Sequence, residues 1–215
     1  MHDYFYGDNM KIDPKTQQRF YNILKSVIIP RPIAFISSKS NLGEVNLAPF
    51  SFFNGVCYDP PTISVSIARF AGDKEKDSIL NIEETGEFVV NMVSQNLAEA
   101  MNATALEYPS NVNEFVVAGL TEAACELVEV PRVLESPVSL ECRLKQVIDI
   151  NKGSRKECAL VIAEVVYCHI DDELYDGRYV DMQGLDLIGR LGGHSYCHID
   201  SVFDMKLGTL NIEKK

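Results

Sequence analysis

Residues 46–51, with the sequence NLAPFS, have the types and spacing to hold a flat, hydrogen-bonding ligand. Since the proline cannot donate to a strand ladder, we expect the backbone there to leave regular pairing and offer its polar groups to a neighbour. Ala48 is small enough for a ring to approach, and Phe50 provides an apolar face. Asn46 and Ser51 provide donors and acceptors at the ring edge. A proline-containing edge strand with a bulge and no ligand is an equally simple interpretation.

A second group of residues, around the start of a predicted helix, has the chemistry of an anion site. Free N–H groups at a helix N-terminus carry partial positive charge, and nearby cations and hydroxyls can complete the coordination of a phosphate. The alternative is that the cations only solvate a loop that also contains acidic residues. The group consists of Ser66, Arg69, Lys74, Lys76, Asp77 and Ser78.

A third group lies near the C-terminus, where a predicted helical turn ends in a glycine-rich bend. Arg190, His194 and Tyr196 project from this bend. Neutral imidazole can donate or accept near physiological pH, so His194 could stack on or protonate a bound heterocycle. A histidine that caps a loop carbonyl is the simpler alternative.

The cysteine and histidine positions do not predict a metal site. In Cys168-His169 and Cys197-His198 the residues are adjacent, so on a strand they point to opposite faces, whereas structural zinc pairs are spaced by about two to four residues. Six cysteines without CxxC spacing favour reduced thiols and a cytoplasmic protein. The motifs GxSxG, GxGxxG and GxxxxGK[ST] do not occur, which argues against a serine hydrolase, a Rossmann fold and a P-loop.

Length and charge narrow the class of protein further. The chain of 215 residues fits a single domain over residues 1–215. A net charge of −11 disfavours nucleic acid and anionic membranes as partners. Residues 1–8 do not resemble a signal peptide, and the chain has no run of about 20 apolar residues that could cross a membrane.

The elements that must position these groups are mostly strands. Residues 41–43 predict a tight turn between the first two strands, and residues 151–153 predict a second hairpin. Meander-like strands with short helical connections indicate a closed or half-open antiparallel barrel. Residues 116–128 fit either a short strand or a helix. The pattern predicts strands at 26–38, 45–53, 62–68, 88–93, 138–150 and 158–170, and helices at 13–27, 77–86 and 94–106.

Five motifs in this order and spacing resemble the flavin reductase-like, flavoredoxin-type FMN-binding split-barrel family. They are residues 46–53, 59–61, 69–78, 87–91 and 189–196, so the resemblance covers a core of about residues 26–196. It implies a mainly β (α+β) split β-barrel with short peripheral helices. It also implies a homodimer with one FMN per subunit near the dimer interface, reduced by NADH or NADPH.

The resemblance also implies roles for individual residues. His194 and Tyr196 are the candidates for the open face of the flavin, with Arg190 beside them. Ser78 stands where many relatives have threonine, a change that keeps the hydroxyl. The resemblance assigns Asn46, Ala48, Pro49, Phe50 and Ser51 to the flavin ring, and Ser66, Arg69, Lys76, Asp77 and Ser78 to the ribityl phosphate.

The expected function is therefore an NAD(P)H-dependent FMN oxidoreductase in which hydride passes from the nicotinamide to flavin N5. One alternative is a flavoredoxin-like carrier that keeps FMN tightly bound and passes electrons to an acceptor protein. Another is a scaffold in which FMN is structural or absent.

Overall fold

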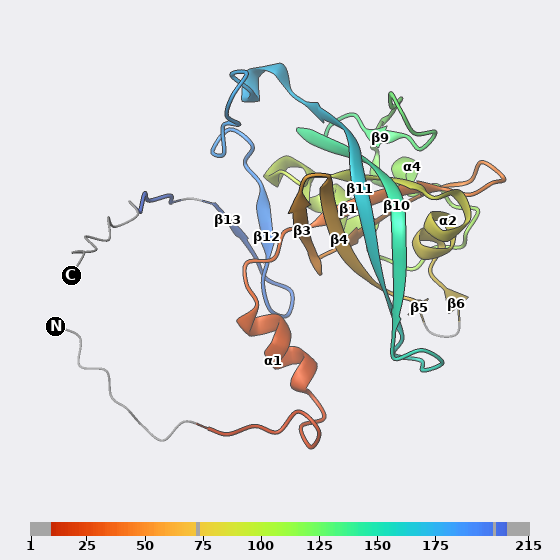
Figure 1. The fold of residues 1–215 in the computed structure, drawn as a ribbon, viewed down its shortest axis with the longest axis vertical. Coiled ribbons are helices and arrows are strands. Elements are labelled where there is room, and N and C mark those ends of the chain that lie inside the picture. The colour runs from red at the N-terminus through yellow and green to blue at the C-terminus, as the bar shows by residue number, and fades with distance from the viewer. Residues whose placement is uncertain (1–9, 72–73, 200, 206–215) are drawn as a thin grey trace, which may run out of the picture.

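The computed structural model describes residues 10–71, 74–199 and 201–205. The expectation about a signal peptide concerns residues that lie outside these ranges. In the described part of the chain, seven strands form one antiparallel sheet, and short helices lie around it (Figure 1). No helix among the described residues is both long and apolar enough to cross a bilayer.

The sheet has the strand order β2-β1-β7-β10-β11-β4-β3. Its strands are β1 Ala34–Lys39, β2 Val45–Phe50, β3 Phe53–Tyr58, β4 Pro61–Ala68, β7 Glu87–Asn91, β10 Val138–Ile150 and β11 Cys158–Ile170. The short strand pairs are β5 Phe70–Ala71 with β6 Lys74–Glu75, β8 Glu122–Ala123 with β9 Arg132–Val133, and β12 Ile188–Arg190 with β13 Tyr196–His198. The helices are α1 Phe20–Val27, α2 Asp77–Thr85, α3 Ala98–Ala103, α4 Glu114–Ala118 and the 3₁₀ turns η1 Gln95–Leu97 and η2 Asp172–Leu174.

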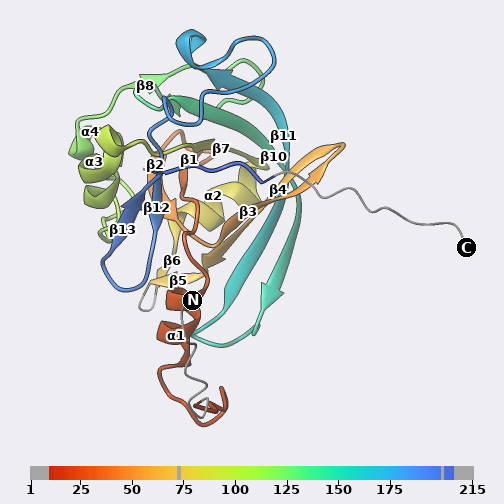
Figure 2. The ribbon, with the colours of Figure 1, turned by 90° about the vertical axis from the view of Figure 1, so that its left-hand side faces the viewer.

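Both predicted hairpins are confirmed. β1 and β2 pair antiparallel, with Ala34 opposite Phe50. β10 and β11 have the predicted bounds and pair from Val138 opposite Ile170 to Ile150 opposite Cys158. This long pair curves along one side of the molecule, and α3 and α4 lie on the opposite side, next to β2 (Figure 2).

The structure corrects the prediction that pairing stops at Pro49. β2 keeps its register through this residue, with Pro49 opposite Phe35. β2 is an edge strand, and the N–H group of Leu47 points outward to Glu114. Because every second residue faces the same edge, the nitrogen of Pro49 also points outward, where a missing donor breaks no ladder bond. The chain leaves the ladder only at residues 51–52.

Three other predicted elements have different bounds. The N-terminal helix begins at Phe20, because Asp13 holds a separate turn in which its carboxylate accepts the N–H group of Lys15 at 2.8 Å. The first strand begins only at Ala34, after two prolines that lack N–H donors. The helical turn expected before the glycine-rich bend is strand β12, and the bend is the turn of the β12–β13 hairpin.

The structure also corrects one predicted helix and decides one region that the sequence left open. The helix expected over residues 94–106 is shorter, with η1 leading into α3. The region that fitted either strand or helix contains both, because α4 ends at Gly119 in the left-handed conformation and β8 follows.

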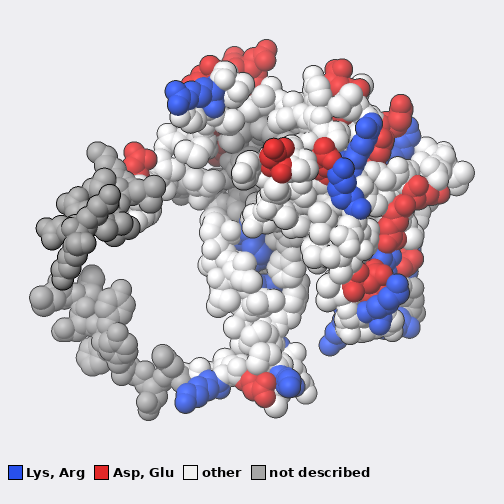
Figure 3. Space-filling view, viewed as in Figure 1, with Lys and Arg blue, Asp and Glu red and all other residues white. Residues whose placement is uncertain are grey.

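Charged side chains are unevenly distributed over the surface. Figure 3 shows Lys, Arg, Asp and Glu gathered over α2, β6 and the turn between β10 and β11. The surface over β12 and α1 is mostly white in the same view. The surface over β12 and α1 is therefore a region without acidic side chains in this view of an acidic protein.

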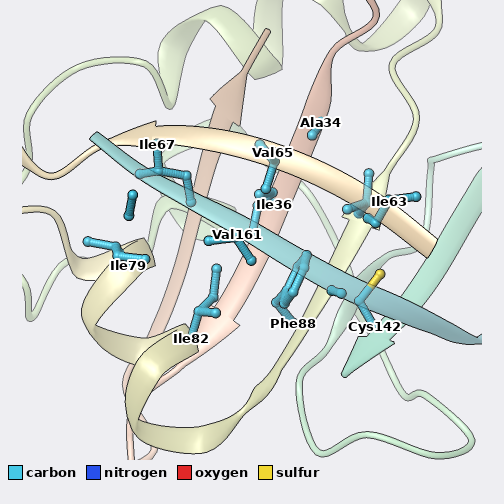
Figure 4. Close-up of a cluster of buried hydrophobic side chains, with 13 residues drawn as sticks. Ala34, Ile36, Ile63, Val65, Ile67, Ile79, Ile82, Phe88, Cys142 and Val161 are labelled. Carbon is cyan, nitrogen blue, oxygen red and sulfur yellow. The ribbon is translucent and has the colours of Figure 1, made fainter. Parts of the chain in front are cut away.

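A hydrophobic core between the sheet and α2 fixes where that helix begins. β4 alternates as predicted, with Ile63, Val65 and Ile67 buried. Ile79 and Ile82 of α2 are fully buried and belong to the same cluster of buried side chains as these β4 residues (Figure 4). Because burying each such side chain contributes about 1.5–3 kcal/mol, the helix is held firmly against the sheet.

Candidate functional site

A hollow of about 140 Å³ lies between β2, the start of α2 and the segment that follows α3. We call it the first hollow. It brings together two groups that the sequence predicted separately, and the side-chain amide of Asn46 donates to the Ser78 hydroxyl at 2.9 Å. From β2 and α2 it is lined by Asn46, Ala48, Pro49, Phe50, Lys76, Asp77 and Ser78, and opposite them by residues 104–108 and Glu114.

The start of α2 has the features of an anion site. Lys76 is the N-cap residue in an extended conformation, and its side chain makes no capping hydrogen bond. The first N–H groups of a helix have no intrahelical partner, so those of Asp77 and Ser78 are available at the wall of the hollow. Lys74 is bonded to Asp77 at 2.9 Å and to Ser110 at 2.7 Å. Lys76 forms no ion pair within the described residues, which leaves its ammonium available to an anion.

Arg69 and Ser66, which the sequence assigned to the phosphate, do not line this hollow. The guanidinium of Arg69 is buried and contacts four carboxylates, at 3.4, 2.8, 2.6 and 3.2 Å from those of Glu75, Glu83, Asp149 and Glu157. The hydrogen bond with Glu83 is the largest influence that raises the pKa of Arg69 above its usual value. These partners remove the reason for assigning Arg69 to a phosphate.

A second hollow, of about 380 Å³, continues from the first across Pro49, Phe50 and Ala105, which line both. It brings the predicted C-terminal group to the predicted ring segment. The His194 side chain is exposed, and Arg190 donates to the Gly193 carbonyl at 2.6 Å. The lining includes Tyr21, Lys25, Arg31, Pro49, Phe50, Ser51, Arg190, His194 and Tyr196.

Sequence reasoning missed several residues of these hollows, among them Lys25, Arg31 and Glu114. The backbone of Arg31 pairs with that of Arg190, with N–O distances of 3.0 and 2.9 Å. Glu114 is buried and its carboxylate accepts the outward N–H group of Leu47 at 3.1 Å. In the sequence the only signal was that Arg31 stands between two prolines, which says nothing about a partner so distant along the chain.

The carboxyl group of Glu114 has a raised pKa, mainly because burial disfavours its charged form. The carboxylate of Asp77 adds to this effect and Lys74 opposes it. Since the folded state holds the proton more tightly than the unfolded chain, this group stabilises the fold at low pH. The contribution is lost as pH rises from the ordinary value of 4.5 through the folded-state pKa.

The Glu114→Gln variant should therefore lose less stability than the wild type between pH 4 and pH 8. Glutamine keeps an oxygen to accept the Leu47 N–H group and cannot ionise. Urea unfolding at several pH values measures the effect. Glu107→Gln is the control, because Glu107 lines the same hollow but is exposed. Parallel stability curves for Glu114→Gln and the wild type would contradict the interpretation.

One group of metal-ligand side chains exists among the described residues, namely Cys125, Glu141 and His169. Its carboxylate is fully buried and already accepts three backbone N–H groups, from residues 126–128, at 2.7, 2.7 and 3.1 Å. The His169 ring nitrogen lies 2.7 Å from the same carboxylate. With its acceptor sites filled, Glu141 serves as a structural anchor, and we assign no metal to it.

Comparison with known proteins links this geometry to a family. The family model for a flavin reductase like domain matches residues 26–184. The crystal structure of nitrilotriacetate monooxygenase component B from Bacillus cereus is 37% identical with a TM-score of 0.87, and the match covers 93% of this chain and 100% of that chain.

Two other solved structures are similar. The 2-nitrobenzoate 2-nitroreductase NbaA of Pseudomonas fluorescens is 29% identical with a TM-score of 0.84, covering 94% of this chain and 98% of that chain. A split-barrel protein from Shewanella frigidimarina is 21% identical with a TM-score of 0.79, covering 93% and 100%. At that identity the likeness concerns the fold alone, and it identifies the architecture of this chain as a mainly β split barrel.

Proposed function

Because this chain belongs to the flavin reductase-like family, we propose that it is an FMN oxidoreductase that takes hydride from a nicotinamide nucleotide. Membership of the family supports flavin-related oxidoreduction. The choice of FMN as the flavin and of a nicotinamide nucleotide as the hydride donor is part of our proposal. The observation that carries the proposal is that Phe50 and Ser78 line one hollow. A ring-binding segment and a phosphate-binding helix start are thereby adjacent.

The residues of the first hollow fit the phosphate end of FMN. They offer the ammonium of Lys76, the hydroxyl of Ser78 and the uncapped N–H groups of α2. Charge-assisted hydrogen bonds of this kind are the strong ones for a phosphate. The hollow of about 140 Å³ suits a phosphate and part of a ribityl chain rather than a whole flavin. We therefore assign the ring to the segment from Ala48 to Ser51, where the two hollows meet.

The second hollow is the proposed place of the nicotinamide nucleotide. When bound, FMN supplies the two-electron acceptor, and the residues of this chain orient the donor and exclude water. Lys25 and Arg190 suit the phosphates of the donor. Tyr196 has the Arg190 guanidinium 4.3 Å from its ring centroid, so it provides a flat, braced surface. His194 is the exposed side chain placed to contact the donor ring.

We also propose that the chain forms a homodimer in a reducing compartment. No residue of α1 is buried, and Val27 and Ile28 at its end are 67% and 51% exposed. Tyr58 on the edge strand β3 is 95% exposed. Apolar side chains exposed to this extent suit an interface with a second copy. All six cysteines are free thiols, which suits a cytoplasmic location.

The purified protein should be yellow, and adding NADH or NADPH without oxygen should bleach its visible flavin absorbance. Added free FMN should then be reduced over many turnovers. Bleaching by dithionite but by neither nucleotide would instead support the alternative, a flavoredoxin-like carrier that exchanges electrons with an acceptor protein. Failure to bind FMN at all, measured by dialysis against the free cofactor, would refute the proposed function.

A further inference from the structure

Arg31 is a buried cation whose side-chain partners are neutral. Only 4% of the Arg31 residue surface is exposed. One terminal nitrogen donates to the carbonyl groups of Lys25 and of Ile28, the latter at 2.8 Å, and the other donates to the carbonyl of Leu191 at 2.8 Å. Within the described residues no carboxylate pairs with it. The guanidinium is well hydrogen-bonded, and its charge is not neutralised.

This arrangement is unusual because buried charges in proteins are normally paired. Arg69 in the same chain shows the ordinary case, with four carboxylates around one guanidinium. For Arg31 the partial negative charge at the C-terminal end of α1 offsets only part of a full positive charge, since a helix terminus carries about half an elementary charge. The remaining charge acts on whatever lies beside it.

The residues beside Arg31 are those of the proposed ring site. Arg31 lines the second hollow together with Pro49, Phe50 and Ser51, and its Nε atom lies 3.5 Å from the Ser51 hydroxyl. The guanidinium carbon lies 5.8 Å from the centroid of Phe52. A fixed charge in this wall is therefore close to any ring held on the segment 48–51.

The charges around this hollow are of one sign. Lys25 and Arg190 line it with Arg31, and no aspartate or glutamate of the described ranges does. Figure 3 shows the same asymmetry, since the surface over β12 and α1 carries no red in that view. In a chain of net charge −11, a hollow whose charged lining residues, as far as the structure describes them, are all cations is a built feature of the site.

The geometry points to Arg31 as a residue that raises the reduction potential of the bound flavin, an inference that rests on the proposed function. In the proposed reaction a hydride, with both electrons, would pass from carbon 4 of the nicotinamide to flavin N5. The nicotinamide would become a cation and the flavin ring would gain one negative charge. A fixed unpaired cation in a buried wall stabilises the ring after it has gained that charge more than before. Lys25 and Arg190 add to the effect more weakly because they are less buried.

The test compares the affinities of the protein for oxidised and for reduced FMN, which together give the potential of the bound flavin. Arg31→Gln should lower the preference for reduced FMN by about tenfold, which corresponds to about 30 mV for a two-electron couple. Arg31→Lys keeps the charge but loses the planar set of donors. It should melt earlier than the wild type and keep a potential close to the wild-type value.

Lys25→Gln provides a second test that leaves Arg31 in place, so its result does not depend on whether the Arg31 variants fold. The backbone carbonyl of Lys25 remains for Arg31 to bind. Within the part of the chain that the structure describes, the lost ammonium contacts the Tyr21 ring, at 4.3 Å, and forms no ion pair. The preference for reduced FMN should fall in the same direction by a smaller factor. Lys156→Gln, on the exposed loop between β10 and β11, removes the same charge away from the hollow and should leave the potential unchanged.

The outcomes separate the two proposals. If the variants bind FMN and neither Arg31→Gln nor Lys25→Gln shifts the potential, Arg31 is only a structural clamp and the inference is wrong while the proposed function stands. If Arg31→Lys lowers the potential as much as Arg31→Gln, the effect comes from lost hydrogen bonds rather than charge, which also overturns it. If the wild type does not bind FMN, both proposals fail together.

Discussion

The Lys76→Ala variant should bind FMN about 10- to 100-fold more weakly than the wild type, because a hydrogen bond to a charged group contributes about 1.5–3 kcal/mol. Riboflavin, which lacks the phosphate, should bind both proteins nearly equally. Lys76 lines the first hollow at the start of α2 and has no ion pair within the described residues, so its ammonium gains its partner only when an anion binds. Fluorescence titration of the flavin-free proteins with each ligand measures both affinities.

The ratio of FMN affinity to riboflavin affinity distinguishes a local contact from a general effect. Lys156→Ala removes the same charge from an exposed loop and should leave the ratio unchanged. Ser78→Ala should reduce the ratio as well, by a smaller factor, because a neutral hydroxyl bond contributes about 1 kcal/mol. Equal losses for FMN and riboflavin in Lys76→Ala would mean that the cation does not contact a phosphate. A loss in Lys156→Ala as large as in Lys76→Ala would point to net charge alone.

Elements set by local patterns could be predicted from the sequence. β10 and β11 have the bounds that alternation predicts, since a long run with period two is compatible with few other structures. β4 buries Ile63, Val65 and Ile67 for the same reason. The start of α2 follows from the change of period at Asp77 and its end from the left-handed Gly86. These signals lie within a few residues of the element they specify.

What could not be predicted depends on partners far along the chain. Arg69 and Arg31 look alike in sequence, but one is surrounded by carboxylates from four other segments and the other by carbonyl groups. For Pro49 the sequence left two interpretations open, a break in the strand and a proline-containing edge strand, and only the strand order shows that β2 lies at an edge. Glu114 binds the outward N–H group of Leu47, and no local pattern links those residues.

The glycines near the C-terminal bend have a second role that the sequence did not predict. They predicted a turn, which exists, but two of them also allow close contact with the last turn of α1 and the segment that follows it. A Cβ atom at Gly189 would lie 2.8 Å from the Cβ of Pro30, and one at Gly192 would lie 2.6 Å from the hydroxyl of Ser26. The close approach seats the β12–β13 hairpin beside Arg31 and so completes the second hollow.

Glu141→Gln should lower the free energy of unfolding by about 3 kcal/mol or more and leave flavin binding intact. The carboxylate is fully buried and holds the N–H groups of Glu126, Leu127 and Val128 together with the His169 ring. In glutamine an NH₂ group replaces one of the two carboxylate oxygens. The N–H groups that donate to that oxygen in the wild type would then face another donor and lose their acceptor. Each orphaned buried donor costs about 1–3 kcal/mol. Glu164→Gln is the control, because the carboxylate of Glu164 is partly exposed and, among the described residues, its one ion pair is with Lys145.

The same variant tests how far the charge of Glu141 makes the free energy of unfolding depend on pH. Burial, the largest single influence, pushes the pKa of Glu141 upward, but the N–H groups of Glu126 and Leu127 and the His169 ring outweigh it and bring the pKa below its usual value. A lowered pKa stabilises the fold above pH 4.5 and loses that contribution as pH falls through the folded-state value. The gap between wild type and Glu141→Gln should therefore narrow as urea unfolding is repeated at pH 7, 5 and 3. A gap that stays constant with pH would show that shape rather than charge makes Glu141 necessary.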